Sequence, residues 1–433
     1  MMKPPIDPLS SQVFSGRCTA VEAVEECLRR ISEYDPEVQS FVAIREKAAL
    51  AEAGILDEIP QRGPLHGVPF AVKDIFETES LATEYNSSLY RGYQADKDAA
   101  VVALLRQAGA IFLGKVSTVE FAGMGNIPPT RNPHNLSYSP GGSSAGSGAA
   151  VGAGMVPLAV ASQTGGSTIR PAAYCGAIGF KPTWGLVPCE GMKPFAPSLD
   201  TVGFIADSTT LMTRVFTSIG NVPETDESPE YDVGPSTPLR IGVYRTRYVS
   251  EASEDVLTAL VRLSTQLTEA GHVVEVVKDP FADSDINALQ DVVMWGEAVT
   301  AMKLELESRY DQLSEAVISA LEPRRQTPHA EIAAAGESLA RLRPLCDRAL
   351  SGYDAWLTPA VPGVAPLMEE GNGAATFNRL FTALHVPCLT LPVGSGADDL
   401  PLGLQLVAAR GADRRLLAVA ASVEKLISES GAH

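Results

Sequence analysis

The sequence predicts an α/β layered fold. Amphipathic helical stretches alternate along the chain with short apolar runs, the pattern of a sheet covered by helices. The composition, with 45% apolar and 20% charged residues, is that of a globular protein with a sizeable core. No run of about 18 apolar residues could span a membrane. The 433 residues suffice for one large domain or about two to three ordinary ones.

The first part of the chain begins with helices, after which strands and helices alternate. Thr19 and Glu22 make a capping box, and apolar residues recur at helical spacing over 19–33. A second helical stretch follows at about 43–54. The next elements are a buried strand ending in a lysine (GVPFAVK, 67–73), a helix over 98–108 and a strand AIFLGK (110–115).

The second part is separated by a Pro-rich, acidic segment over 221–239, which predicts a surface linker. We found no internal repeat. The strand RIGVY, a helix over 253–270, the strand HVVEVV and a helical region to about 350 come next. The last elements are two strand-plus-turn segments (354–366 and 386–394), the strand GLQLVAA (403–409) and a closing helix over 412–428.

Net charge and cysteine content limit the classes to which this protein can belong. The net charge of −18 argues against nucleic acid or an anionic membrane surface as a partner, because both require basic patches. No cysteine pair has metal-site spacing, no secretory h-region is present, and a cytoplasmic protein without a metal is expected. The scattered cysteines are typical of reduced core residues: Cys18, Cys27, Cys175, Cys189, Cys346 and Cys388.

The stretch from Ser139 to Pro171 is the unusual part of the chain. Glycine and serine are concentrated there, which could indicate low complexity. Apolar residues such as Val151 and Met155 are interleaved with them, whereas a flexible linker is polar throughout. We therefore expect a tightly packed, buried helix followed by the strand VPLAVAS (156–162), and an active site of a serine-dependent hydrolase.

Two parts of such a site can be argued from the residues. In the segment Gln163 to Ser167 (QTGGS), two glycines before a serine allow backbone N–H groups to converge on an oxyanion. Lys73 ends an apolar strand, where burial favours the neutral form that accepts a proton. None of the six histidines is a convincing base; His134 lies nearby but fits a loop residue. The spacing of the serines alone does not show which of them has which role in catalysis.

The motifs resemble the amidase signature family. The resemblance rests on PGGSSAGSGAAVGAGMVPLA, QTGGSTIRPAAYCGAIGFKPTWG, GVPFAVKD, GKVSTVEFA, RNPHN, LDTVGF and LPLGLQLVAA, and it runs from about residue 15 to 428. It implies a triad in which Ser167 is the nucleophile, Ser143 a bridging serine with a cis peptide, and Lys73 the base. The implied oxyanion donors are the N–H groups of Thr164, Gly165, Gly166 and Ser167. No cofactor is implied.

The resemblance also implies a single α/β/α domain over 1–433, with a large mixed sheet covered by helices on both faces. Its expected parts are N-terminal helices (about 1–60), a Gly/Ser-rich catalytic core (about 61–210), a surface crossing at 221–239, and a helical insertion with returning strands (about 240–433). The linker is then a crossing within one domain.

Arg170 is a candidate for binding the substrate. The QTGGSTIRPA version of the motif looks closest to bacterial malonamidase-like amidases, in which an arginine at this position is thought to bind a substrate carboxylate. A structural arginine that binds carbonyls is the alternative. Gln163 stands where many members have Asp, and His385 where many have Gly. With Ser144, these two complete the candidate substrate-binding residues, although His385 could equally be a packed residue.

The expected function is hydrolysis of a small carboxylic acid amide to the acid and ammonia or amine, with a carboxylate-bearing amide as a hypothesis. The alternatives are the glutaminase (A) subunit of a tRNA-dependent amidotransferase and an aryl-amide or ester hydrolase. A catalytically dead scaffold is disfavoured because all three triad positions are occupied. The expected partners are a small-molecule amide, without nucleic acid or membrane, in a homodimer or monomer.

Overall fold

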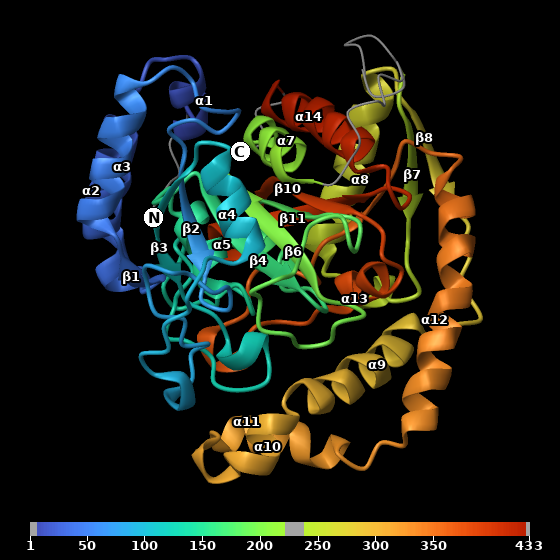
Figure 1. Ribbon diagram of the computed structural model, residues 1–433. Helices are drawn as coiled ribbons and strands as arrows, with labels where there is room; N and C mark the ends of the chain where they lie inside the picture. Colours follow the sequence, from blue (N-terminus) through green and yellow to red (C-terminus); the bar gives the residue numbers. More distant parts are fainter. Residues whose placement is uncertain (1–6, 221–237, 430–433) are drawn as a thin grey trace.

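The structure, a computed structural model, describes residues 7–220 and 238–429 (Figure 1). The strands of this part of the chain form one mixed sheet of eleven strands in the order β1-β3-β2-β4-β6-β5-β10-β11-β9-β7-β8. The strands are β1 (Phe41–Ile44), β2 (Pro69–Lys73), β3 (Ile111–Val116), β4 (Leu158–Gln163), β5 (Ile178–Lys181), β6 (Thr201–Ala206), β7 (Arg240–Tyr244), β8 (Val273–Val277), β9 (Ala355–Pro359), β10 (Cys388–Ser395) and β11 (Pro401–Val407).

The sheet joins the two parts of the chain that the acidic segment separates. Strand β10 returns from the second part to pair with β5 in an antiparallel register. Strands β2, β3 and β4 are parallel to one another, as are β7, β8 and β9. The predicted large mixed sheet is thus confirmed. The predicted linker at 221–239 lies almost wholly outside the described residues, and the division into one domain over 1–433 stays a prediction.

Helices cover both faces of the sheet. Helices α4, α7, α8 and α14 form a chain of contacts over one face, and α2, α3, α5 and α6 lie on the other (Figure 1). Helices α9 to α12 form an arm that extends from the sheet. The helices are α1 (Leu9–Phe14), α2 (Ala20–Val38), α3 (Glu46–Glu58), α4 (Ala100–Gln107), α5 (Ala145–Gly152), α6 (Ile169–Tyr174), α7 (Thr209–Ile219), α8 (Glu254–Glu269), α9 (Ile286–Ala301), α10 (Lys303–Ser308), α11 (Glu315–Leu321), α12 (His329–Leu350), α13 (Thr376–Ala383) and α14 (Asp413–Glu429).

Local sequence explains the ends and the burial of these elements. The predicted capping box at Thr19 and Glu22 is present at the start of α2. Strands β2, β3 and β4 are buried along their whole length, because helices cover both of their faces. They are therefore apolar over most of their length and do not alternate. Every residue of α5 is buried, as the Gly/Ser stretch predicts.

Within the described residues, no helix is both long and apolar enough to cross a membrane.

Candidate active site

Lys73 is the last residue of β2 and is fully buried. Its Nζ lies 2.8 Å from the Oγ of Ser143 and 2.8 Å from the Oγ of Ser162, which projects from the neighbouring strand β4. The two strands run parallel, so their carboxyl ends deliver both side chains to the same edge of the sheet, where α/β proteins commonly bind ligands. Sequence reasoning missed Ser162; the signal was a serine at the end of the apolar strand VPLAVAS.

Burial changes the acid–base properties of this lysine. Removal from water lowers the pKa of Lys73 to about 7, against an ordinary value of 10.5. The carboxylate of Asp200 raises this pKa and the guanidinium of Arg170 lowers it further, both through smaller effects. Near neutral pH the amine is therefore present in both its protonated and its neutral form, and the neutral form can accept a proton.

Ser143 follows Gly142 across a cis peptide bond, just before α5. Its hydroxyl is buried and contacts Lys73. The carbonyl of Gly142 accepts hydrogen bonds from Nε and Nη2 of Arg170, at 3.1 and 2.6 Å. The peptide that carries Ser143 is thus fixed by a bidentate guanidinium contact on one side and by the lysine on the other.

The turn from Thr164 to Ser167 connects β4 to α6. Gln290 on α9 donates to the carbonyl of Thr164 at 3.0 Å, and Thr382 on α13 donates to the carbonyl of Gly165 at 2.7 Å. In a trans peptide the C=O and the following N–H point in opposite directions. The N–H groups of Gly165 and Gly166 are therefore turned away from α9 and α13, and no protein acceptor meets them within the described residues.

Gln163 is the support of this turn. Its Oε1 accepts from the N–H groups of Thr168 and Ile169, at 3.0 and 3.1 Å, and its Nε2 donates to the hydroxyl of Thr382 at 3.0 Å. These bonds use both acceptor positions of the amide oxygen and one of the two N–H donors of the amide nitrogen. Gln163 therefore shapes the start of α6, and its predicted role in substrate binding stays a prediction.

Ser167 is partly exposed at the end of the turn, whereas its neighbours on either side are buried. Its hydroxyl makes no hydrogen bond to Ser143 or to any other described residue. A free hydroxyl at the mouth of the turn, next to free backbone N–H groups, is the arrangement that nucleophilic attack on a carbonyl requires.

Arg170, in the first turn of α6, contacts backbone carbonyls. Besides its two bonds to Gly142, its Nη1 donates to the carbonyl of Gly373. Burial lowers its pKa to about 10, so the guanidinium remains charged at neutral pH. These contacts with backbone carbonyls are those expected of a structural arginine. The role of Arg170 in binding a substrate carboxylate stays a prediction.

Ser144 and His385 contact the site differently. The hydroxyl of Ser144 lies 3.4 Å from both the N and the O of Ser162, which links α5 to β4. His385 bonds the carbonyl of Ser198 through Nε2 at 2.8 Å and stacks on Trp184 with ring centroids 4.6 Å apart. It has no contact with the lysine or the two serines, and a substrate role for either residue stays a prediction.

Asp200 was not singled out as a site residue, although it lies in the LDTVGF block. It is buried, and one of its oxygens accepts from the hydroxyl of Thr164 at 2.5 Å. The other accepts from the N–H groups of Phe195 and Ala196, at 2.8 and 3.1 Å. Asp200 therefore contacts the turn from Thr164 to Ser167 and also raises the pKa of Lys73.

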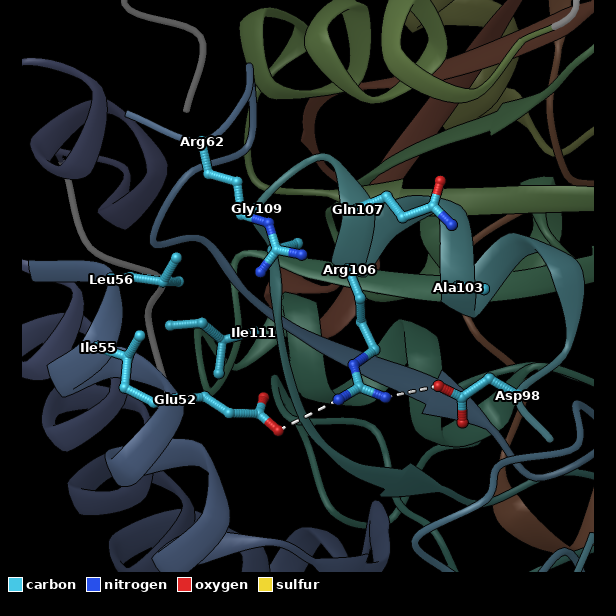
Figure 2. Close-up of a pocket in the computed structure, with 11 residues that line it drawn as sticks. Glu52, Ile55, Leu56, Arg62, Asp98, Ala103, Arg106, Gln107, Gly109 and Ile111 are labelled. Carbon is cyan, nitrogen blue, oxygen red and sulfur yellow. Dashed lines mark hydrogen bonds and ion pairs between the residues drawn. The ribbon is translucent and has the colours of Figure 1, made fainter. Parts of the chain in front are cut away.

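A separate hollow of about 310 Å³ lies between α3 and α4 (Figure 2). Figure 2 shows Arg106 within it, paired with Glu52 on one side and Asp98 on the other. No residue of the serine–lysine site lines this hollow, and its arginine is already bound by two carboxylates. It therefore takes no part in the chemistry described above.

The mixed sheet and the lysine–serine pair beside a glycine turn are those of an amide hydrolase. A family model described as Amidase matches residues 22–417, and the chain belongs to this family, the amidase signature family. Its members are hydrolases that act on amide C–N bonds, and this chain is one of them.

Relatives and solved structures agree with this assignment. The (A) subunit of the glutamyl-tRNA(Gln) amidotransferase of Alkaliphilus metalliredigens (strain QYMF) is 30% identical over 460 residues, which cover 94% of this chain and 93% of that protein. A peptide amidase from Stenotrophomonas maltophilia has a TM-score of 0.84 at 26% identity, covering 98% of this chain and 97% of that chain. A protein from a vestigial complex, described as revealing the origins of an s-triazine catabolic enzyme, has a TM-score of 0.86 at 27% identity, covering 98% of both chains.

The prediction about partners is wrong. It admitted a small-molecule amide, no nucleic acid, and a homodimer or monomer. Relatives that cover more than nine-tenths of the chain are subunits of amidotransferases named for their action on glutamyl-tRNA(Gln). Net charge failed as a criterion because it sums the whole surface, whereas contacts with nucleic acid depend on local patches or on other subunits.

Proposed function

We propose that this chain cleaves amides through an acyl-enzyme on Ser167, with Ser143 and Lys73 as the proton relay. The observation that carries the proposal is the hydrogen-bonded pair of Lys73 and Ser143 beside the turn that presents Ser167. A lysine with a pKa of about 7 supplies a neutral base in a site where no histidine contacts a serine of the relay. The serine between base and nucleophile provides the path for the proton.

The reaction proceeds in two halves. As the Oγ of Ser167 attacks the amide carbonyl, its proton passes to the Oγ of Ser143, whose own proton passes to the Nζ of Lys73. The negative charge that develops on the carbonyl oxygen is bound by the N–H groups of the turn, Thr164 to Ser167. When the C–N bond breaks, the same relay returns the proton to the leaving nitrogen, and water then hydrolyses the ester on Ser167 by the reverse sequence.

For the substrate, the glutaminase (A) subunit of a tRNA-dependent amidotransferase has the best support. Relatives with this description match at 30% and 32% identity over 94% and 92% of the chain. In this role the chain releases ammonia from glutamine while other subunits hold the tRNA. The cysteines, none of which forms a disulfide, agree with a reducing, cytoplasmic location.

Hydrolysis of a small amide to the free acid is the second candidate. It is supported by the similarity to a peptide amidase over nearly the whole chain. The malonamidase-like form of the motif adds the carboxylate clamp at Arg170 to this candidate. The contacts of that guanidinium with Gly142 and Gly373 use three of its five N–H groups, which leaves two for a ligand.

Ammonia release by the purified chain tests the proposal. The substrates are glutamine, malonamate and propionamide, and the variant is Ser167→Ala. We expect that substitution to abolish turnover of every substrate, whereas Ser147→Ala, a serine of α5 whose hydroxyl binds the carbonyl of Val160, should retain it. Wild-type turnover by Ser167→Ala would disprove the acyl-enzyme, and a preference for malonamate over glutamine would favour the second candidate.

A further inference from the structure

A second hollow, of about 660 Å³, lies where the loop after β5 meets α12 and the segment between α13 and β10. Its volume is within the range of small-molecule sites, about 300–1,000 Å³. Trp184 from the loop, Arg343 from α12 and His385 from the segment before β10 all line it. No residue of the serine–lysine site belongs to its lining, so this hollow is a separate feature of the molecule.

Two stacked rings belong to the lining. The rings of Trp184 and His385 lie 4.6 Å apart at an angle of 17°, and the N–H of Trp184 donates to the carbonyl of His385 at 3.3 Å. The imidazole is buried and bonds the carbonyl of Ser198 at 2.8 Å, whereas the indole is 39% exposed. His385 has a φ of 64°, a conformation that favours glycine. This chain therefore keeps a histidine at a glycine-like position, and its ring supports an indole that stays open to solvent.

Two arginines supply hydrogen-bond donors to the same lining. Arg410 binds Asp347, the one carboxylate of the lining, through Nε at 2.9 Å and through Nη2. Arg343 donates from Nε to the carbonyl of Ala383 at 3.1 Å, and within the described residues this is its only hydrogen bond. A guanidinium has five N–H donors, so both Nη groups of Arg343 remain for a ligand.

The charges of the lining are close enough to act on one another. Burial, and then the charge of Arg410, lower the pKa of Arg343. Burial, and then the charge of Arg343, lower the pKa of His385 to about 3, so this ring is neutral at pH 7. The two guanidinium groups outnumber the single carboxylate among the residues that line the hollow. The hollow is thus locally positive in a chain whose net charge is −18.

We infer that this hollow binds a small anion joined to a flat ring, with its phosphate or carboxylate on Arg343 and its ring stacked on Trp184. A guanidinium binds either anion through paired N–H groups, and an exposed indole is a stacking surface for a flat ring. A nucleoside monophosphate and an aromatic carboxylate share this chemistry. The inference adds a second ligand site to the chain and does not depend on the proposed hydrolysis of amides.

Four probes separate the ring from the anion: AMP has a ring and a phosphate, adenosine lacks the phosphate, ribose 5-phosphate lacks the ring, and benzoate carries a carboxylate instead. Their affinities for the full chain are measured by calorimetry. We expect Arg343→Gln to weaken AMP, ribose 5-phosphate and benzoate by about 10- to 100-fold, the range for charge-assisted hydrogen bonds, and to spare adenosine. Tighter binding of AMP or of benzoate identifies the anion that the hollow prefers.

The stacked rings are tested by a second substitution. Glycine suits the positive φ of His385, so His385→Gly should fold while removing the support of the indole. It should weaken AMP and adenosine and leave ribose 5-phosphate unchanged. AMP should also quench tryptophan fluorescence in the wild type. That quenching should be lost in Trp184→Leu, although Trp295 and Trp356 remain.

The matched control is Arg341→Gln, also on α12. The side chain of Arg341 is 69% exposed, lies 3.9 Å from Glu337 and does not line the hollow. This variant should leave all four affinities unchanged. Equal losses of AMP and adenosine in Arg343→Gln would show that the arginine only maintains the local structure, and they would overturn the inference. So would a wild-type chain that binds none of the probes with a Kd below about 1 mM.

Discussion

Two fully buried lysines on neighbouring strands have opposite surroundings. Lys73 ends β2 and Lys115 lies near the end of β3, with Lys73 opposite Val116 and Lys115 opposite Val72. Since successive side chains of a strand point to opposite faces, the two lysines leave the sheet on different sides. Lys73 contacts the hydroxyls of Ser143 and Ser162, whereas Lys115 contacts a carboxylate, a carbonyl and a hydroxyl.

The partners decide what each lysine can do. The three N–H groups of a charged Lys115 match three oxygens, from Asp74 at 2.9 Å and from Phe76 and Thr83 at 2.8 Å each. A neutral Lys115 would have only two N–H groups, and the lone pair on its Nζ would face one of these oxygens. Lys73 faces two hydroxyls, and a hydroxyl can either donate or accept. Both protonation states of Lys73 can therefore be satisfied, which is what a base that cycles between them requires.

The largest effect is expected for Lys73→Met. Turnover should fall by at least about 10²- to 10⁴-fold, because one general base supplies that range. The fold should tolerate the change, since methionine fills a similar volume and brings no charge into the core. At pH 7 the wild-type lysine carries the cost of a pKa lowered from 10.5 to about 7, so we expect the melting temperature of Lys73→Met to be no lower than that of the wild type.

The pH dependence of stability gives a second readout. A lowered pKa means that the unfolded chain binds more protons than the folded one between about pH 7 and 10.5, so wild-type stability should rise over this interval. That part of the rise should be missing in Lys73→Met. A variant that kept wild-type turnover would remove Lys73 from the mechanism.

The same substitution at Lys115 should have the reverse profile. Lys115→Met leaves the buried carboxylate of Asp74 without its cation, and breaking a buried pair in this way costs about 3–5 kcal/mol of unfolding free energy. Chemical denaturation measures the loss. Activity per folded molecule should change far less than for Lys73→Met, because Lys115 lies on the other side of the sheet.

The double variant Lys115→Met with Asp74→Asn tests the cause. Removal of the stranded charge should recover part of the lost stability, since a neutral amide still accepts from the N–H of Glu84. A double variant less stable than the single one would show that the packing of Lys115, and not the unpaired charge, sets the cost.

The sequence alone did not distinguish the two lysines. Both stand at the end of an apolar strand, in GVPFAVK and AIFLGK, and burial follows from either pattern. The burial argument named Lys73 as a candidate base, and the resemblance of its motif to a family then assigned it that position. The partners that separate the two, Ser143 and Ser162 against Asp74, are set by strand register and by which face of the sheet each side chain occupies, and periodicity does not encode these.

Much of the fold was predictable because most of its strands are short, mainly apolar runs and many of its helices are amphipathic. Strands β2, β3, β4, β7 and β8 were predicted at nearly their observed positions. Strand β6, with the sequence TVGFIA, was seen only as part of the LDTVGF motif. Gln290 and Thr382, which hold the turn from Thr164 to Ser167, come from helices far along the chain, and only the tertiary structure brings them to it.

The smallest effect is expected from removing the charge of Asp200, which changes the pKa of Lys73. If Lys73 is the base, kcat/KM should rise with pH through about 7, as the amine loses its proton. The carboxylate of Asp200 raises the pKa of Lys73 because a nearby negative charge stabilises the ammonium. Removing that charge favours the neutral amine, so Asp200→Asn should move the rising limb of the profile to lower pH.

Asparagine suits this test because it preserves the local contacts. Its carbonyl oxygen can still accept from the N–H groups of Phe195 and Ala196, and its NH₂ can donate to the hydroxyl of Thr164. The profile of kcat/KM is measured for both proteins over the same buffers. If the rising limb of the pH profile stays in place or moves to higher pH, the titrating group is not Lys73. The different surroundings of the two buried lysines would then not explain catalysis.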